Sequence, residues 1–106
     1  MSNGIDRLFA TIASRKGADP KSSYTAKLLA EGVEKCAKKL GEEATETVIA
    51  AVGGHKTELA KESADLLYHL LVVWAASGIT PDEVYAVLSA REGQSGLEEK
   101  ASRPKG

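Results

Sequence analysis

The sequence predicts an all-α protein, and three observations support this fold class. Apolar residues recur at the three- and four-residue spacing of amphipathic helices along most of the chain. Strand-like alternation of apolar and polar residues is scarce. Glycines and two of the three prolines separate the helical segments from one another. The predicted helices cover residues 5–14, about 23–29, about 32–52, about 57–76 and 81 to about 91.

The boundaries of these helices have recognisable chemical causes. Ser22-Ser23 supply a suitable N-cap for the short second helix, and Gly53-Gly54 separates the two long helices. Gly78 ends the fourth helix. Thr80 and Glu83 can close a capping box at the start of the last. We expect one domain over residues 1–106, with a mobile tail from about residue 92.

The composition excludes several classes of protein. A chain of 106 residues with 42% hydrophobic and 27% charged residues is typical of a soluble globular domain. The net charge of -1 does not favour nucleic-acid binding. Residues 66–76 form the most apolar stretch, which is too short to span a membrane, and the N-terminus does not resemble a signal peptide. The single cysteine, Cys36, fits a reducing compartment, so we expect a cytoplasmic protein.

The two long helices should form an antiparallel hairpin, because the connection between them is short. On a helical wheel the apolar stripe of the first passes through Val33, Leu40, Ala44, Thr47 and Ala51. The stripe of the second passes through Leu59, Leu66, Leu70 and Val73.

Each of these helices carries two acidic residues on the same flank of its stripe. They are Glu43 and Glu46 on the first helix and Glu62 and Asp65 on the second. The midpoints of the two pairs are equally far from Gly54, so all four carboxylates should converge. Such a group repels itself unless a cation is present, and carboxylates without His or Cys suit Mg²⁺ or Mn²⁺.

Solvated glutamates on helix surfaces are the simpler explanation of either pair alone. The match of spacing, flank and height between the two pairs favours the metal site instead. Glu42 lies opposite the stripe and is an outer candidate to orient or deprotonate an attacking water.

These motifs resemble a known family. Glu42-Glu43-x-x-Glu46 followed by Glu62-x-x-Asp65 is similar to the signature of the all-α nucleoside triphosphate pyrophosphatases of the MazG type. Ser23-Tyr24-Thr25, the segment 38–43, the segment 62–71 and the tail with Arg91 and Lys100 resemble the phosphoribosyl-ATP pyrophosphatase branch.

The resemblance implies Mg²⁺-dependent hydrolysis of phosphoribosyl-ATP to phosphoribosyl-AMP and pyrophosphate, in the second step of histidine biosynthesis. It implies that Glu43, Glu46, Glu62 and Asp65 bind the metal. Substrate-binding candidates are Ser23, Tyr24, Thr25, Lys38, Lys39, Arg91 and Lys100. The simpler explanations of these residues are N-capping of a helix and a solvated charged surface.

Structural roles are expected for several other residues. His69 should be packed among apolar residues, His55 exposed at the turn, Trp74 in the core or an interface, and Cys36 an inert core residue. Few aromatics and short helices give a modest core, so we expect a homodimer that completes a four-helix-bundle-like core. Two alternatives are a pyrophosphatase that removes dUTP-like nucleotides and a non-catalytic helical dimerisation module.

Overall fold

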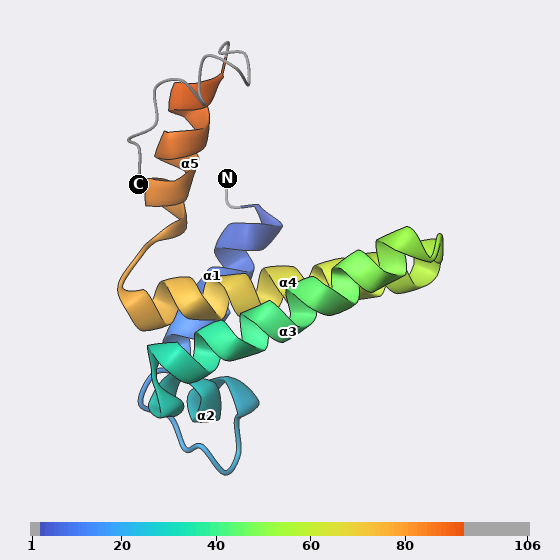
Figure 1. Cartoon of the computed structure of the whole chain (residues 1–106). Coiled ribbons are helices and arrows are strands. Elements are labelled where there is room, and N and C mark those ends of the chain that lie inside the picture. The colour runs from blue at the N-terminus through green and yellow to red at the C-terminus, as the bar shows by residue number, and fades with distance from the viewer. Residues whose placement is uncertain (1–2, 93–106) are drawn as a thin grey trace.

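A computed structural model describes residues 3–92 of the chain as helices joined by short connections (Figure 1). The helices are α1 (Gly4–Ser14), α2 (Tyr24–Glu31), α3 (Val33–Val52), α4 (Lys56–Ser77) and α5 (Pro81–Arg91). No strand occurs among these described residues. The predicted all-α class and all five predicted helices are therefore confirmed.

The helix ends follow the predicted capping chemistry. Ser23 accepts a hydrogen bond from the backbone N–H of Ala26 at the start of α2. Gly78 ends α4 in the left-handed conformation, with φ of 76°. Thr80 and Glu83 form both hydrogen bonds of the capping box at the start of α5. These local contacts explain why the boundaries could be predicted to within one or two residues.

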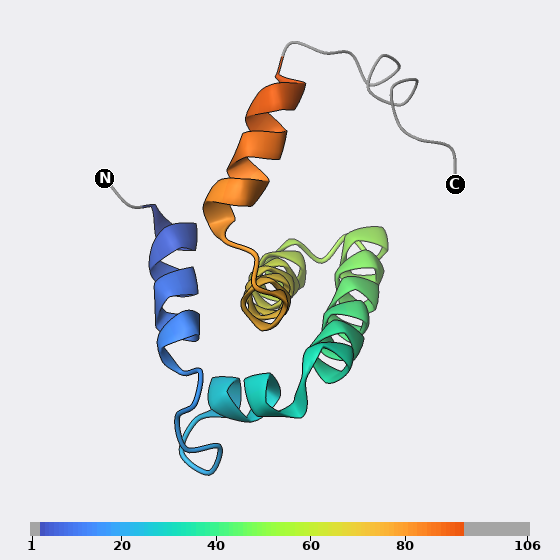
Figure 2. The same ribbon diagram turned by 90° about the vertical axis from the view of Figure 1, so that its left-hand side faces the viewer.

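α4 is the central helix of the molecule. Seen along its axis, it is surrounded by α1, α2 and α3 (Figure 2). The most buried core residues come from all four of these helices: Ile12, Leu28, Cys36, Leu71, Val72 and Ala75. Because α4 is held on several sides, it provides a fixed base for the side chains that it presents toward α3.

α3 and α4 form the expected antiparallel hairpin. The chain turns at Gly53-Gly54, and Gly54 has a φ of 72° that favours glycine. The hydroxyl of Thr47 lies between the two helices, where it donates to the carbonyl oxygen of Glu43 at 2.8 Å or of Glu62 at 3.3 Å. This contact fixes the two helices together beside their acidic residues.

The predicted apolar stripe of α3 is only partly right, because Leu40, Ala44 and Thr47 are half-buried but its other two residues are not. Val33 is 44% exposed and Ala51 is exposed, whereas Cys36 and Ala50 are buried. The buried side of α3 is rotated by about 60° from the predicted one, toward Glu43. The reason is that α3 packs against both α2 and α4. The side of α3 with the most apolar residues is therefore not the side that is buried.

Several other structural expectations are confirmed. His69 and Cys36 are buried, and the Cys36 thiol donates to the carbonyl oxygen of Leu28 at 3.2 Å. His55 is exposed at the hairpin turn, and Trp74 is partly buried against the core. The tail that was predicted to be mobile falls, apart from its first residue, outside the described residues. Among residues 3–92, no single helix is long and apolar enough to cross a membrane; α4 and α5 pass only jointly, bent by 111°.

Candidate active site

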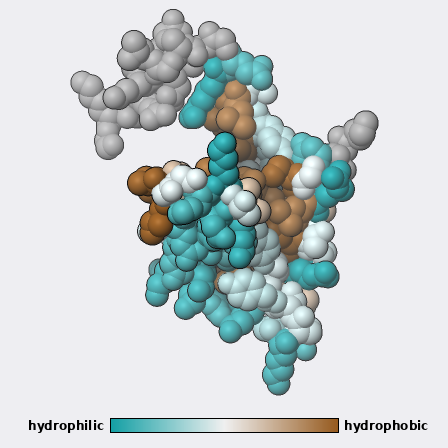
Figure 3. Space-filling model, turned by 90° about the vertical axis from the view of Figure 1, so that its right-hand side faces the viewer, coloured by the Kyte–Doolittle hydropathy of each residue, from teal (hydrophilic) through white to brown (hydrophobic). Residues whose placement is uncertain are grey.

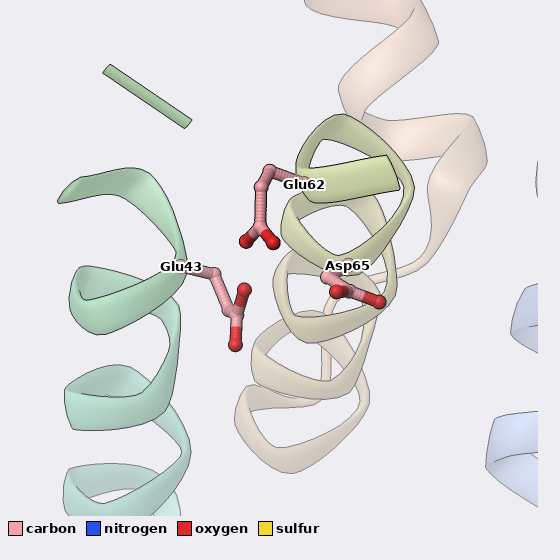
Figure 4. A group of neighbouring side chains, drawn as sticks. All are labelled: Glu43, Glu62 and Asp65. Atoms are coloured by element: carbon pink, nitrogen blue, oxygen red, sulfur yellow. The ribbon is translucent and has the colours of Figure 1, made fainter. Parts of the chain in front are cut away.

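Three carboxylate groups meet in the space between α3 and α4. Glu43 lies on α3, Glu62 and Asp65 lie on α4, and one oxygen of each is within 4.8 Å of the others. Glu43 points from α3 toward α4, and Glu62 points back toward α3 (Figure 4). The three-residue spacing of Glu62 and Asp65 puts both on one face of α4. The structure thus brings these three predicted residues together.

Glu46 joins the same group from α3. Its negative charge acts on Glu43 and Glu62, and it lines a cavity together with Glu62, although most of Glu46 is exposed. Glu43, Glu62 and Asp65 therefore meet at one place, and Glu46, the fourth residue predicted to converge there, lies next to them. We call this group the carboxylate cluster.

Crowding makes the carboxylate cluster bind protons more tightly than isolated carboxylates do. The hydrogen bond with Glu46, followed by burial and nearby negative charge, raises the pKa of Glu62 to about 7. Burial, followed by the charge of Glu46, raises the pKa of Glu43 above its ordinary value. At neutral pH the cluster therefore favours binding of a proton or a metal cation.

Two buried oxygen atoms of the cluster have no hydrogen-bond partner within the described part of the chain. They are Oε2 of Glu43 and Oε2 of Glu62. A carboxylate oxygen that has lost water without gaining a partner is destabilising, and a hard divalent cation is the partner that such oxygens prefer. Because the cluster contains only carboxylates, its chemistry fits Mg²⁺ or Mn²⁺.

A cavity of about 220 Å³ lies beside the cluster, near the hairpin turn. Its lining residues are Glu46, Ile49, Ala50, His55, Glu58 and Glu62. Glu58 and His55 were not predicted to belong to the site. Glu58 lies one helical turn before Glu62 on α4, and this four-residue spacing is a signal that could have identified it.

The outer residues of the first motif lie apart from the carboxylate cluster. Glu42 is exposed and forms an ion pair with Lys39, with 3.5 Å between Oε2 and Nζ. Lys38 is exposed on the same helix. The structure therefore separates Glu42 from the inner carboxylates, as the helical wheel predicts.

The segment Ser23-Tyr24-Thr25 begins α2 and contacts α4. The Thr25 hydroxyl hydrogen-bonds with the hydroxyl of Tyr68. The Tyr24 ring is 53% exposed and meets the ring of His69 edge-on, with 6.3 Å between the ring centroids. The structure thus places this predicted substrate-binding segment against the helix that carries Glu62 and Asp65, through contacts by Tyr68 and His69 that were not predicted.

Arg91, the predicted C-terminal site residue that the structure describes, is not brought to the carboxylate cluster. α5 extends away from the α3–α4 hairpin (Figure 1), and Arg91 is its last residue. Arg91 contributes instead to a cavity of about 340 Å³ along α5, together with apolar residues such as Val87 and Leu88. Lys100 lies outside the described residues.

Comparison with known proteins identifies the family of this chain. Residues 5–92 match the family model described as phosphoribosyl-ATP pyrophosphohydrolase. This span includes α1 to α5 and the whole carboxylate cluster. The chain belongs to the phosphoribosyl-ATP pyrophosphohydrolase family.

Several similar members of the phosphoribosyl-ATP pyrophosphohydrolase family come from bacteria. The chain is 67% identical to the phosphoribosyl-ATP pyrophosphatase of Parvibaculum lavamentivorans, over 93% of this chain and 91% of the relative. Identity is 63% to the enzyme of that name from Cereibacter sphaeroides, over 93% and 96% of the two chains. Identity to the phosphoribosyl-ATP pyrophosphatase of Azospirillum brasilense is 59%, over 93% of this chain and 89% of the relative. The similarity to this family therefore covers nearly the whole chain.

Proposed function

We propose that this protein is a phosphoribosyl-ATP diphosphatase, which hydrolyses phosphoribosyl-ATP to phosphoribosyl-AMP and pyrophosphate. The reaction is the second step of histidine biosynthesis. The observation that carries the proposal is the carboxylate cluster between α3 and α4 in a chain of this family. The carboxylate cluster would also suit a pyrophosphatase of dUTP-like nucleotides, and the family match favours phosphoribosyl-ATP over that alternative and over a non-catalytic module.

Four residues are proposed to hold a metal ion, Mg²⁺ or alternatively Mn²⁺. They are Glu43, Glu46, Glu62 and Asp65. A bound Mg²⁺ would supply positive charge for phosphate oxygens and lower the pKa of a water molecule. The buried oxygens of Glu43 and Glu62 that lack a partner support this role. Glu42 is proposed to orient or deprotonate the attacking water from outside the metal's ligands, and its exposed position on α3 leaves it open to solvent.

The substrate is a polyanion, so its binding needs donors and cations near the carboxylate cluster. We propose that the start of α2 contacts its phosphates through Ser23, Tyr24 and Thr25. Lys38 and Lys39 on α3 are proposed to neutralise phosphate charge. Arg91 and Lys100 are proposed to act from the C-terminal part of the chain.

The apolar surface of the hairpin supports the proposal of a homodimer. On α3, Val48 is 61% exposed, Ile49 65% and Val52 85%. Apolar surface is visible on the side of the molecule that carries the hairpin tip (Figure 3). Burial of such side chains is favourable by about 25 cal/mol for each Å² of apolar surface removed from water. A second copy of the chain can cover them. We also propose that the dimer acts in the cytoplasm.

The test is to measure pyrophosphate release from phosphoribosyl-ATP beside a panel of nucleotides that includes dUTP. We expect turnover of phosphoribosyl-ATP with Mg²⁺, loss of turnover with EDTA, and recovery when Mg²⁺ is restored. A preference for dUTP would contradict the proposed substrate. Equal turnover with and without EDTA would contradict the proposed metal dependence.

A further inference from the structure

The start of α2 is joined to α4 by a hydrogen bond between two hydroxyl groups. Thr25 lies in the first turn of α2, and Tyr68 lies on α4, 43 residues later in the chain. Both side chains are partly buried. In this place the bond is shielded from water, and its loss would leave a polar group without its partner.

Tyr68 is also close to the carboxylate cluster along α4. It follows Asp65 by three residues, which is slightly less than one helical turn. A rigid helix therefore connects the metal-binding carboxylates to the hydroxyl that holds Thr25. This connection is one of the contacts that hold the α2 start relative to the cluster, beside the buried Ala26 and Leu28 of α2.

A buried polar atom lies at the corner where Tyr24, Tyr68 and His69 meet, and a ligand can supply the partner that it lacks among the described residues. His69 is 6% exposed, and its Nδ1 atom has no hydrogen-bond partner among residues 3–92. The rings of Tyr24 and Tyr68 meet its ring edge-on, with centroid distances of 6.3 Å and 5.0 Å. Tyr24 is half exposed, so the corner borders on solvent on that side. A phosphate or sugar oxygen is a suitable partner for such a nitrogen.

We propose that Tyr68 is a positioning residue for substrate, which acts by holding Thr25 and the start of α2 at a fixed place beside the carboxylate cluster. The proposal rests on the proposed function, in which Thr25 contacts the phosphates of a nucleotide polyphosphate. Tyr68 itself is not a catalytic residue. Its hydroxyl is engaged by Thr25, and its effect on substrate passes through that residue.

The test is Tyr68→Phe, which removes the hydroxyl and keeps the ring against His69. We expect KM for phosphoribosyl-ATP to rise by about five- to tenfold, since one hydrogen bond that orients a binding residue is lost. The kcat at saturating substrate and the Mg²⁺ concentration for half-maximal activity should stay within about twofold of the wild type.

The matched control is Tyr85→Phe. The Tyr85 hydroxyl donates to Asp6 at 2.9 Å, so this variant also loses one tertiary hydrogen bond of a tyrosine, but between α5 and α1. Its KM should equal that of the wild type. In a Thr25→Val background, Tyr68→Phe should add little to the KM, because the partner is already absent.

Two results would overturn the proposal. One is an unchanged KM for folded Tyr68→Phe, even if its melting temperature falls, since this would make Tyr68 a stabilising residue only. The other is a KM increase of full size in the Thr25→Val background, since the effect would then not pass through Thr25. Failure of the wild type to hydrolyse phosphoribosyl-ATP would contradict the proposed function alone, and the same KM comparison with the nucleotide that it does hydrolyse would still decide the role of Tyr68.

Discussion

Glu62 is the residue at which burial, hydrogen bonding and charge repulsion act together. Its carboxyl group faces Glu43 and Glu46, and one of its oxygens is buried without a partner. These contacts make the negatively charged form unfavourable until a proton or a cation is bound. The same residue therefore links the stability of the metal-free protein to pH.

The stability of the metal-free protein should fall as the pH rises from about 5 to about 8. The pKa of Glu62 is about 7 in the folded protein and 4.5 ordinarily. The folded state holds this proton more tightly than the unfolded state does. The contribution of protonated Glu62 to stability is therefore complete below about pH 4.5 and is lost as the pH rises through about 7. Melting temperatures measured in EDTA across this range check the prediction.

Two controls connect this pH dependence to the cluster. Glu62→Gln cannot release a proton at this position, so its melting temperature should depend less on pH. Mg²⁺ added at about pH 8 should raise the melting temperature of the wild type more than that of the variant. A wild-type melting temperature that is constant or rises with pH over this window would refute the explanation.

The acidic residues of the cluster could be predicted from the sequence because their positions depend only on helical spacing and on a short turn. The prediction of this group required no knowledge of the other helices; its members are Glu43, Glu46, Glu62 and Asp65. The contacts of Tyr68 and His69 with α2 could not be predicted in this way. They depend on how α2 folds back onto α4, and no spacing within a single helix records that.

At the scale of elements, the α3–α4 hairpin depends on a polar contact as well as on apolar packing. The Thr47 hydroxyl lies within donating distance of a backbone carbonyl of each helix, that of Glu43 on α3 and that of Glu62 on α4. Thr45, two residues earlier, bonds only the carbonyl of Gly41 in its own helix, at 3.1 Å. The two threonines therefore form a natural pair for comparison.

Thr47→Val should destabilise the protein by about 1 kcal/mol, because a carbonyl of α4 loses a partly buried donor. Thr45→Val should change stability by less than about 0.5 kcal/mol, since its hydroxyl is exposed and its bond lies within one helix. Urea unfolding at equal protein concentration, compared at constant m value, measures both. Equal stability of the two variants would mean that the contact between the helices is unimportant.

Helix boundaries were predictable because capping residues are local, whereas the buried face of α3 was not. The wheel assumed that the densest apolar line of a helix faces its partner. In the structure α3 contacts both α2 and α4, so Cys36 and Ala50 are buried and Val33 is not. The orientation of a helix is set by its several neighbours, which the hairpin alone does not define.

At the scale of the whole molecule, the described part of the chain has a small core and a large exposed apolar surface. Few residues are fully buried, and the largest of these side chains are Ile12, Leu28, Leu71, Val72 and Cys36. Val48, Ile49 and Val52 remain exposed on the hairpin. The sequence indicated such a modest core through its scarcity of aromatic residues, but not which surface a second copy would cover.

Val48→Lys should shift the protein from dimer toward monomer, because a charged side chain would replace an apolar one in the proposed interface. Ala13→Lys makes the same kind of change at an exposed position on α1 and should leave the dimer intact. Sedimentation velocity at micromolar concentration measures both variants. A wild-type protein that sediments as a folded monomer would contradict the proposed dimer.

The most direct test of the proposed function is Mg²⁺-dependent release of pyrophosphate from phosphoribosyl-ATP by Glu62→Gln beside the wild type. Glu34→Gln, the same substitution at an exposed site in the first turn of α3, is the control. We predict that Glu62→Gln stays folded by circular dichroism but loses at least about 100-fold in turnover, whereas Glu34→Gln keeps full activity. Wild-type turnover by folded Glu62→Gln would contradict a metal site in the carboxylate cluster.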